Sequence, residues 1–218
     1  MKSGTIKALF LDIGGVLLTN GWGHESRKLG AEKYGLDYAD MEERHEQVFD
    51  AYETGKITLD DYLKMVVFQQ KRDFTKKEFT DFMFEQSRAL DGHIDFFKEI
   101  KQKHRLKVIA VSNEGRELNE YRIKKFGLDD LFDAYVSSCY VHLHKPDIDM
   151  LRMACDISHI PREHALYIDD NSIMADLASF YGMPSLHFQG LDKAKDFLKT
   201  CTFYKQQGKN YNNAGTDI

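Results

Sequence analysis

The chain has 218 residues, of which 42% are hydrophobic, so it can bury one large core or a core that carries an inserted segment. Its formal net charge of −5 argues against a nucleic-acid partner, and no apolar run approaches the about 18 residues that cross a bilayer. The first residues do not resemble a signal peptide. Three cysteines (Cys139, Cys155 and Cys201) lack a CxxC pair, which predicts reduced thiols in a cytoplasmic protein that contacts no membrane.

The first predicted element is a buried strand that ends on an acid. An apolar run begins at Ala8, reaches Asp12 and passes directly into Gly14 and Gly15. A buried strand needs no acid at its end, whereas open α/β folds place their chemistry at the mouth of the sheet. Paired glycines also let the chain turn sharply and let a ligand approach the backbone. Taken alone, Asp12 is equally well explained as the cap of a turn.

From about residue 21 to residue 89 the pattern becomes helical. Residues 59–67 carry an apolar stripe at helical spacing. Thr58 with Asp61, and Thr75 with Glu78, have the spacing of a helix N-cap and its third position. We expect about four short helices in this block.

The remainder alternates helices and strands, which predicts a parallel sheet with right-handed crossovers. Strands are expected at 106–111, 134–137, 165–168 and 184–188, and helices at 93–103, 115–125, 147–157, 172–181 and 191–199. Polar residues follow three of these strands: Ser112-Asn113, then Lys145-Pro146-Asp147, then Asp169-Asp170. Pro146 is expected at the first position of a helix, where its missing N–H costs nothing.

An acid, a hydroxyl, a lysine and an acid pair thus follow successive strands in that order. This set (Asp12, Ser112, Lys145 and Asp169-Asp170) resembles the four motifs of the haloacid dehalogenase-like hydrolase superfamily, over roughly residues 6–190. The resemblance implies an α/β fold: a Rossmann-like parallel sheet core with an inserted helical-bundle cap. The core would comprise residues 1–19 and 90–200, and a type 1 cap residues 20–89. We expect the polar tail at 201–218 to be disordered.

The resemblance also implies a reaction, in which a phosphoryl group is transferred to Asp12 and the acyl phosphate is then hydrolysed. Mg²⁺ would be held by Asp12, the carbonyl of Gly14 and Asp170, with Asp169 acting through water or orienting that shell. Two adjacent acids at a strand end are in any case poorly explained as core.

Three residues would bind the phosphate in this reaction. Ser112 and the amide of Asn113 would donate to the phosphoryl oxygens, and Lys145 would neutralise charge. The turn between two predicted helices, with Glu53, Gly55 and Lys56, resembles the family's substrate-specificity loop. The alternative is that Gly55 only stops a helix.

Two positions depart from the family pattern. Gly14 stands where many members carry a general acid–base, whose loss typically costs about 10²–10⁴ in rate. A subgroup similar to sugar-1-phosphate phosphatases shares this feature, and leaving groups of low pKa would suffer least. Alternatively, Glu53 or His24 supplies the proton when the cap closes. His142 stands where many relatives have glycine; it either narrows the loop or is a surface histidine.

The sequence therefore predicts a Mg²⁺-dependent phosphomonoester hydrolase, monomeric or homodimeric, that acts on a small phosphorylated metabolite, possibly a sugar phosphate, through an aspartyl phosphate. One alternative is a pseudoenzyme that binds a phosphorylated ligand or a protein partner. Another is a 2-haloacid dehalogenase, which the acid pair Asp169-Asp170 and the lack of an arginine soon after Asp12 disfavour.

Overall fold

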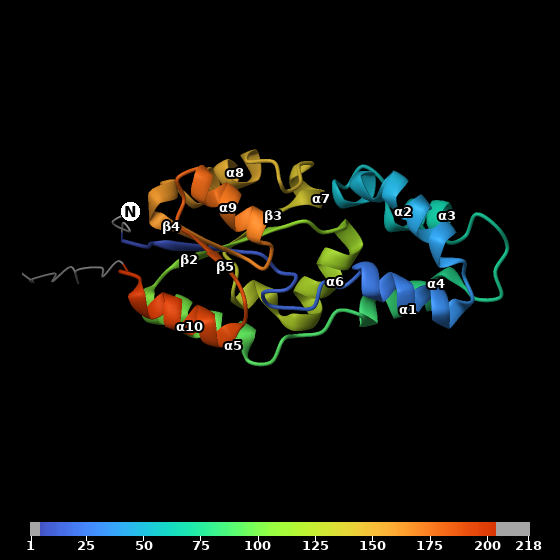
Figure 1. Ribbon diagram of the computed structural model, residues 1–218, viewed down its shortest axis with the longest axis horizontal. Coiled ribbons are helices and arrows are strands. Elements are labelled where there is room, and N and C mark those ends of the chain that lie inside the picture. Colours follow the sequence, from blue (N-terminus) through green and yellow to red (C-terminus); the bar gives the residue numbers. More distant parts are fainter. Residues whose placement is uncertain (1–4, 204–218) are drawn as a thin grey trace, which may run out of the picture.

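The computed structural model describes residues 5–203, and five parallel strands in this part form one sheet in the order β3-β2-β1-β4-β5 (Figure 1). The strands are β1 (Ala8–Leu11), β2 (Lys107–Ser112), β3 (Ala134–Ser137), β4 (Ala165–Asp169) and β5 (Ser185–His187). The predicted α/β architecture with a parallel sheet is confirmed. Because β1 lies in the centre, the residue that follows it has a neighbouring strand end on each side.

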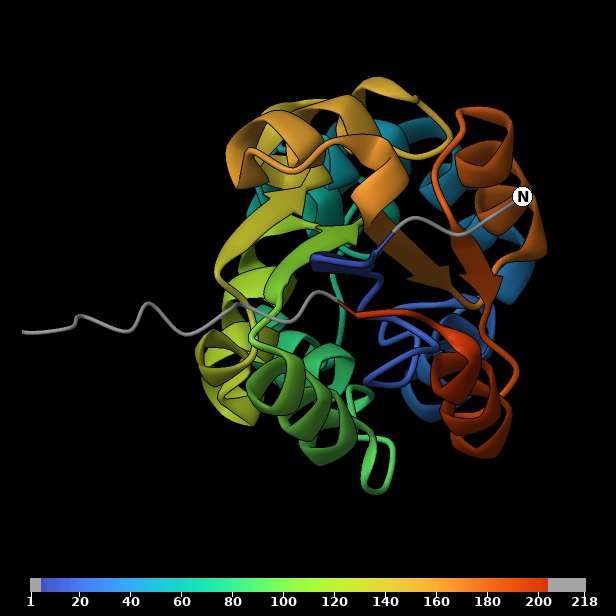
Figure 2. The same cartoon turned by 90° about the vertical axis from the view of Figure 1, so that its left-hand side faces the viewer.

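Helices cover both faces of the sheet (Figure 2). On one face lie α5 (His93–His104), α6 (Arg116–Phe126) and α10 (Leu191–Thr200); on the other lie α8 (Asp149–Ser158) and α9 (Ser172–Phe180). Successive residues of β1 point to opposite faces, so Leu9 and Leu11 join one buried cluster while Phe10 joins the other. A strand buried on both faces must be apolar throughout, as this one is.

A second lobe contains four helices, as the pattern predicted: α1 (His24–Tyr34), α2 (Tyr38–Glu53), α3 (Leu59–Val66) and α4 (Lys76–Glu85) (Figure 1). We call α1–α4 the helical lobe. It has its own buried cluster, in which Tyr62 and Phe79 are fully enclosed. Thr58 and Thr75 form complete capping boxes at the starts of α3 and α4. Both helix starts are thereby confirmed.

Two local expectations were wrong, and one short helix was not predicted. Pro146 does not begin a helix: α8 begins at Asp149, because the preceding loop first carries Lys145 to the mouth of the sheet. A short helix, α7 (Ser138–Val141), follows β3. Residues 201–203 are ordered against the first segment of the chain, where Ile6 N donates to the carbonyl of Thr202 at 2.8 Å. The remainder of the predicted tail, 204–218, lies outside the described residues.

Among the described residues, no helix combines the length and the apolar character that a membrane span requires.

Candidate active site

Three strands bring their polar ends together at one edge of the sheet. Leu11 is aligned with Ala110 of β2 and Ile168 of β4, so Asp12 and Asp169 lie at the same level and Ser112 lies one residue further along β2. Asp12, Ser112 and Asp169 are all buried there. The sequence predicted this group from the strand ends alone, and the register of the sheet explains why it forms.

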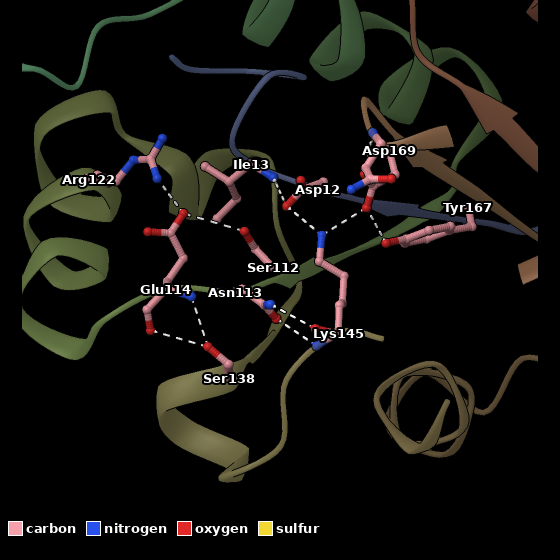
Figure 3. Close-up of polar contacts among 11 residues, drawn as sticks. Asp12, Ile13, Ser112, Asn113, Glu114, Arg122, Ser138, Lys145, Tyr167 and Asp169 are labelled. Carbon is pink, nitrogen blue, oxygen red and sulfur yellow. Dashed lines mark hydrogen bonds and ion pairs between the residues drawn. The ribbon is translucent and has the colours of Figure 1, made fainter. Parts of the chain in front are cut away.

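Lys145 lies between two of the acids (Figure 3). Its Nζ is 3.1 Å from Asp12 Oδ1 and 2.8 Å from Asp169 Oδ2. Burial alone would lower the pKa of Lys145, but Asp12, Tyr167 and Asp169 together raise it well above its usual value. The lysine is therefore a fixed positive charge.

Asn113 holds the backbone of Lys145 in place. Its side-chain oxygen accepts from Lys145 N at 2.8 Å, and its Nδ2 donates to the Lys145 carbonyl at 3.1 Å. The residue after Ser112 thus positions the loop that carries the lysine. The side chain of Asn113 is fully engaged, so only its backbone amide remains as a candidate phosphate donor.

Asp12 is oriented by its neighbours. Its Oδ1 accepts from the amide of Ile13 at 2.8 Å and also faces Lys145. Burial raises the pKa of Asp12 to about 6, against the opposing effect of Lys145 and with a further rise from Asp169. At neutral pH the side chain is therefore mostly a carboxylate, which is the form that acts as a nucleophile or a metal ligand.

The two adjacent acids have different surroundings. Asp169 is wholly buried: its Oδ2 accepts from Lys145 Nζ and from Tyr167 Oη, and its Oδ1 accepts from the amide of Asn171 at 2.8 Å. Asp170 is partly exposed, and burial followed by the charge of Asp169 raises its pKa. Asp169 is engaged by three protein donors, whereas the side chain of Asp170 is partly exposed and is contacted by Asn20.

The acids fit a divalent cation. Carboxylate oxygens of Asp12, Asp169 and Asp170 lie within 4.8 Å of one another. Three acids beside a single lysine leave an excess of negative charge, and oxygen donors of this kind suit Mg²⁺. Gly14 lines the same cavity as Asp12, and its backbone carbonyl is a further candidate oxygen ligand.

A cavity of about 470 Å³ opens onto Asp12 and is lined by residues from both the sheet and the helical lobe. Asp12, Ser112 and Lys145 form its floor. One face of α2 forms a wall, because its pocket residues recur at helical spacing: Glu42, His45, Glu46, Phe49, Tyr52 and Glu53.

The residues of the turn that resembled a specificity loop do not all face the same cavity. Glu53 lines the cavity, whereas Lys56 lines a separate depression beside His142 and His144. Gly55 packs against the carbonyl of Cys139, to which a Cβ at this position would approach within 2.3 Å. Gly55 is therefore required by close packing, besides its positive φ of 67°.

Sequence reasoning missed two buried ion pairs in the cavity wall. Glu114 pairs with Arg122, and both side chains are only 3% exposed. Arg27 pairs with Glu42, and this contact lowers the pKa of Glu42 to about 2. Charged residues in helical stretches are normally solvated, so the sequence carried no signal for either pair.

It also missed the contacts of Tyr167 and His142. Tyr167 reads as a core aromatic inside β4, but its hydroxyl donates to Asp169. His142 Nδ1 contacts the carbonyl of Thr54 at 2.7 Å, so it links the loop after α7 to the helical lobe.

Comparisons with known proteins give one family. The family model for haloacid dehalogenase-like hydrolases matches residues 6–176. A drimenol cyclase, DrtB of Aspergillus calidoustus, is 25% identical over 193 residues, which are 87% of this chain and 35% of that protein. The chain thus spans about a third of the length of this curated relative.

Solved structures share the fold. A haloacid dehalogenase family enzyme of Bacteroides thetaiotaomicron superimposes with a TM-score of 0.76 at 20% identity, covering 89% of this chain and 99% of that one. That enzyme was also crystallised with magnesium and inorganic phosphate, a form with a TM-score of 0.72 at 19% identity that covers 88% of this chain and 99% of its own. The L-2-haloacid dehalogenase RSc1362 has a TM-score of 0.60 at 18% identity, with coverages of 84% and 86%. Because the family model spans most of the chain, this protein belongs to the haloacid dehalogenase-like hydrolases.

Proposed function

We propose that this protein is a magnesium-dependent phosphomonoester hydrolase that acts through an aspartyl phosphate on Asp12. The observation that carries the proposal is the buried Lys145, placed between Asp12 and Asp169 with the carboxylate of Asp170 nearby; Asp12 and Lys145 line a cavity. A lone carboxylate would repel a phosphate dianion, whereas a carboxylate flanked by a fixed cation and a metal site can attack it.

Asp12 is the proposed nucleophile. Its carboxylate is held by Ile13 N and Lys145, which limits its rotation before attack. Ser112 and the backbone amide of Asn113 would donate to the equatorial oxygens of the phosphoryl group, and Lys145 would offset their charge. Each of these groups comes from a strand end or from the loop that Asn113 fixes, so the donors are arranged before substrate binds.

Asp12, Asp170 and the carbonyl of Gly14 would hold Mg²⁺, with Asp169 anchoring Lys145. The metal would supply positive charge at the phosphate and orient it for attack. The structurally similar enzyme of B. thetaiotaomicron crystallised with magnesium and inorganic phosphate supports this assignment.

The helical lobe would act as the cap that selects the substrate. A cavity of about 470 Å³ has the volume of sites for small metabolites. The wall formed by α2 is rich in hydrogen-bonding groups, including Glu46 and Glu53. This favours a leaving group with several hydroxyls, such as a sugar. Lys56 would contact only a substrate that extends beyond this cavity.

The proposal is tested by release of inorganic phosphate from a panel of phosphorylated metabolites, with Mg²⁺ and with EDTA. Asp12→Asn should reduce turnover to background, because an amide is a poor nucleophile and a weaker metal ligand. Asp196→Asn, the same change at an exposed position of α10, is the control. Activity retained in a folded Asp12→Asn sample would overturn the assignment of the nucleophile.

The same preparation distinguishes the alternatives. Halide release from 2-haloacids without Mg²⁺ would identify a dehalogenase. Binding of phosphate and Mg²⁺ without turnover of any substrate would identify a pseudoenzyme.

A further inference from the structure

We propose that Glu53 of the helical lobe donates the proton to the leaving oxygen and then accepts a proton from the attacking water. This inference rests on the proposed phosphatase function and adds a catalytic residue to it. It concerns a side chain that reaches the cavity from α2, on the side opposite the strand ends.

The backbone of Glu53 is fixed to the sheet lobe. Its carbonyl accepts a hydrogen bond from Ser138 Oγ at 2.7 Å, and the same hydroxyl accepts from the amide of Glu114 at 2.8 Å. Glu114 lies two residues after Ser112. The position of Glu53 is thereby tied to the segment that carries the proposed phosphate donors.

The residues around Glu53 reinforce this docking. The ring of Tyr52 occupies the space where Gly115 has no side chain; a Cβ there would lie 2.2 Å from the ring. On the other side, the carbonyl of Thr54 contacts His142 at 2.7 Å, and Gly55 packs on the backbone of Cys139. The end of α2 therefore holds Glu53 against the sheet lobe rather than on a free turn.

Of the other glutamates in the cavity wall, two are already paired and one is exposed. Glu42 pairs with Arg27 and Glu114 pairs with Arg122. Glu46 is exposed and lies seven residues before Glu53, about 10 Å along the helix. Within the described part of the chain, no donor or cation is paired with the carboxylate of Glu53, although His144 and Lys145 act on it at longer range.

The histidines nearby cannot fill this role. His45 lines the cavity, but burial and then Arg27 lower its pKa to about 4, so it carries no spare proton at neutral pH. His24, the other candidate in the sequence, is 63% exposed, contacts Glu42 and Tyr38, and does not itself line the cavity. Gly14 has no side chain to offer.

The surroundings of Glu53 suit proton exchange. Burial is the main cause that raises its pKa to about 7; Glu114 and Asp50 raise it further, while His144 and Lys145 oppose the rise. A carboxyl with a pKa near the working pH is present in both forms, which is the condition for acting first as an acid and then as a base.

The proposed steps balance. Asp12 attacks phosphorus, the bond from phosphorus to the ester oxygen breaks, and that oxygen takes the proton of Glu53 to leave as an alcohol. The Glu53 carboxylate then removes a proton from water as the water attacks the phosphorus of the aspartyl phosphate. The bond from phosphorus to Asp12 breaks, releasing inorganic phosphate, and Glu53 is protonated again.

The test compares Glu53→Gln with wild type in single-turnover phosphorylation of Asp12, using 4-nitrophenyl phosphate and a primary alkyl phosphate. The aryl leaving group needs no proton, so its burst rate should stay within about threefold of wild type, whereas alkyl transfer should fall by about 10²-fold or more. Hydrolysis of the aspartyl phosphate should slow for both substrates, so the phosphoenzyme should accumulate. In the wild type, the rate of phosphoryl transfer from the alkyl phosphate should decline above about pH 7. This decline should be absent in Glu53→Gln.

Glu43→Gln, the same change on α2 at an exposed position outside the cavity lining, should match wild type throughout. Equal losses for aryl and alkyl bursts would show a structural role and overturn the proposal, as would no loss for either. If the wild-type protein phosphorylates on Asp12 and Glu53→Gln changes nothing, only the role of Glu53 fails. A wild-type protein that hydrolyses no phosphate ester would overturn the proposed function as well.

Discussion

Gly15 and Asp170 are in such close contact that only a glycine fits. A Cβ on Gly15 would lie 1.9 Å from Asp170 Oδ2, and the φ angle of Gly15 is +68°. The turn after β1 is thus packed directly against the acid that follows β4. The placement of a proposed metal ligand depends on the absence of a side chain 155 residues earlier in the chain, by the difference of the two residue numbers.

Gly15→Ala should therefore weaken activation by Mg²⁺. The methyl group must displace the Asp170 carboxylate, so we expect the Mg²⁺ concentration for half-maximal activity to rise about tenfold or more, a loss of about 1.4 kcal/mol in binding. Gly35→Ala is the matched control, because Gly35 has a similar φ of +60° but no atom within 4 Å of a Cβ. Both variants should lose stability from backbone strain. Superimposable Mg²⁺ titrations for the two variants would contradict the prediction.

Asp169→Ala should mainly reduce stability, whereas Asp170→Ala should mainly weaken Mg²⁺ activation. Asp169 is buried and accepts from Lys145 and Tyr167, so its removal should lower the free energy of unfolding by about 3–5 kcal/mol. Asp170 is partly exposed, so its removal should leave stability nearly unchanged and raise the Mg²⁺ requirement. Denaturant unfolding and Mg²⁺ titration measure the two effects. A stable Asp169→Ala protein with the larger Mg²⁺ defect would reverse this ranking.

Gly14→Asp should be tolerated and should supply a second proton donor. A Cβ on Gly14 meets only the Oδ1 atom of Asn20 closely, at 2.8 Å; Asn20 is an exposed side chain that can turn aside, with loss of its contact to Asp170. In the Glu53→Gln background, Gly14→Asp should restore alkyl phosphate hydrolysis more than aryl phosphate hydrolysis. The ratio of the two kcat/KM values is the measurement. A uniform loss on both substrates would mean that the new carboxylate disturbs the metal site instead.

His45→Gln should change how stability depends on pH. Tyr62 Oη accepts from Trp22 Nε1 at 3.0 Å and lies 2.8 Å from His45 Nδ1, within hydrogen-bond distance of the imidazole ring. The pKa of His45 is lowered to about 4, so between about pH 6.5 and pH 4 the unfolded chain binds the proton more tightly than the folded chain. The contribution of the neutral His45 to the free energy of unfolding is therefore complete above about pH 6.5 and is lost as the pH falls toward about 4.

Melting temperatures from pH 7.5 to pH 4 provide the measurement. The stability advantage of wild type over His45→Gln should shrink as the pH falls, because glutamine does not titrate and can still form a hydrogen bond with Tyr62. Glu42 is present in both proteins, so the titration of its unfolded side chain contributes to both melting curves, and the mutual effect of Glu42 and His45 is part of the measured difference. A constant difference at every pH would show that His45 is not held neutral.

The strands were predictable because each carries its signal locally. The apolar run of β1 ends on Asp12, and β4 ends on Asp169 in the same way; parallel strands must then bring these ends to one edge. The helix starts at Thr58 and Thr75 were likewise predictable, because each capping box is formed by two residues three positions apart. The helix start predicted at Pro146 was wrong because the loop there carries Lys145 to the site, and the helix begins only at Asp149.

The sequence by itself determined the alternation of strands and helices, the helical block between β1 and α5, and the acids, hydroxyl and lysine at the strand ends, because these depend on neighbouring residues and on period. Only the tertiary structure decided what each acid of the pair contacts: Lys145 and Tyr167 engage the buried Asp169, whereas Asp170 is partly exposed. It also placed Glu53 in the cavity and Lys56 outside it. Such choices arise from contacts between segments distant in the chain, for which no local pattern exists.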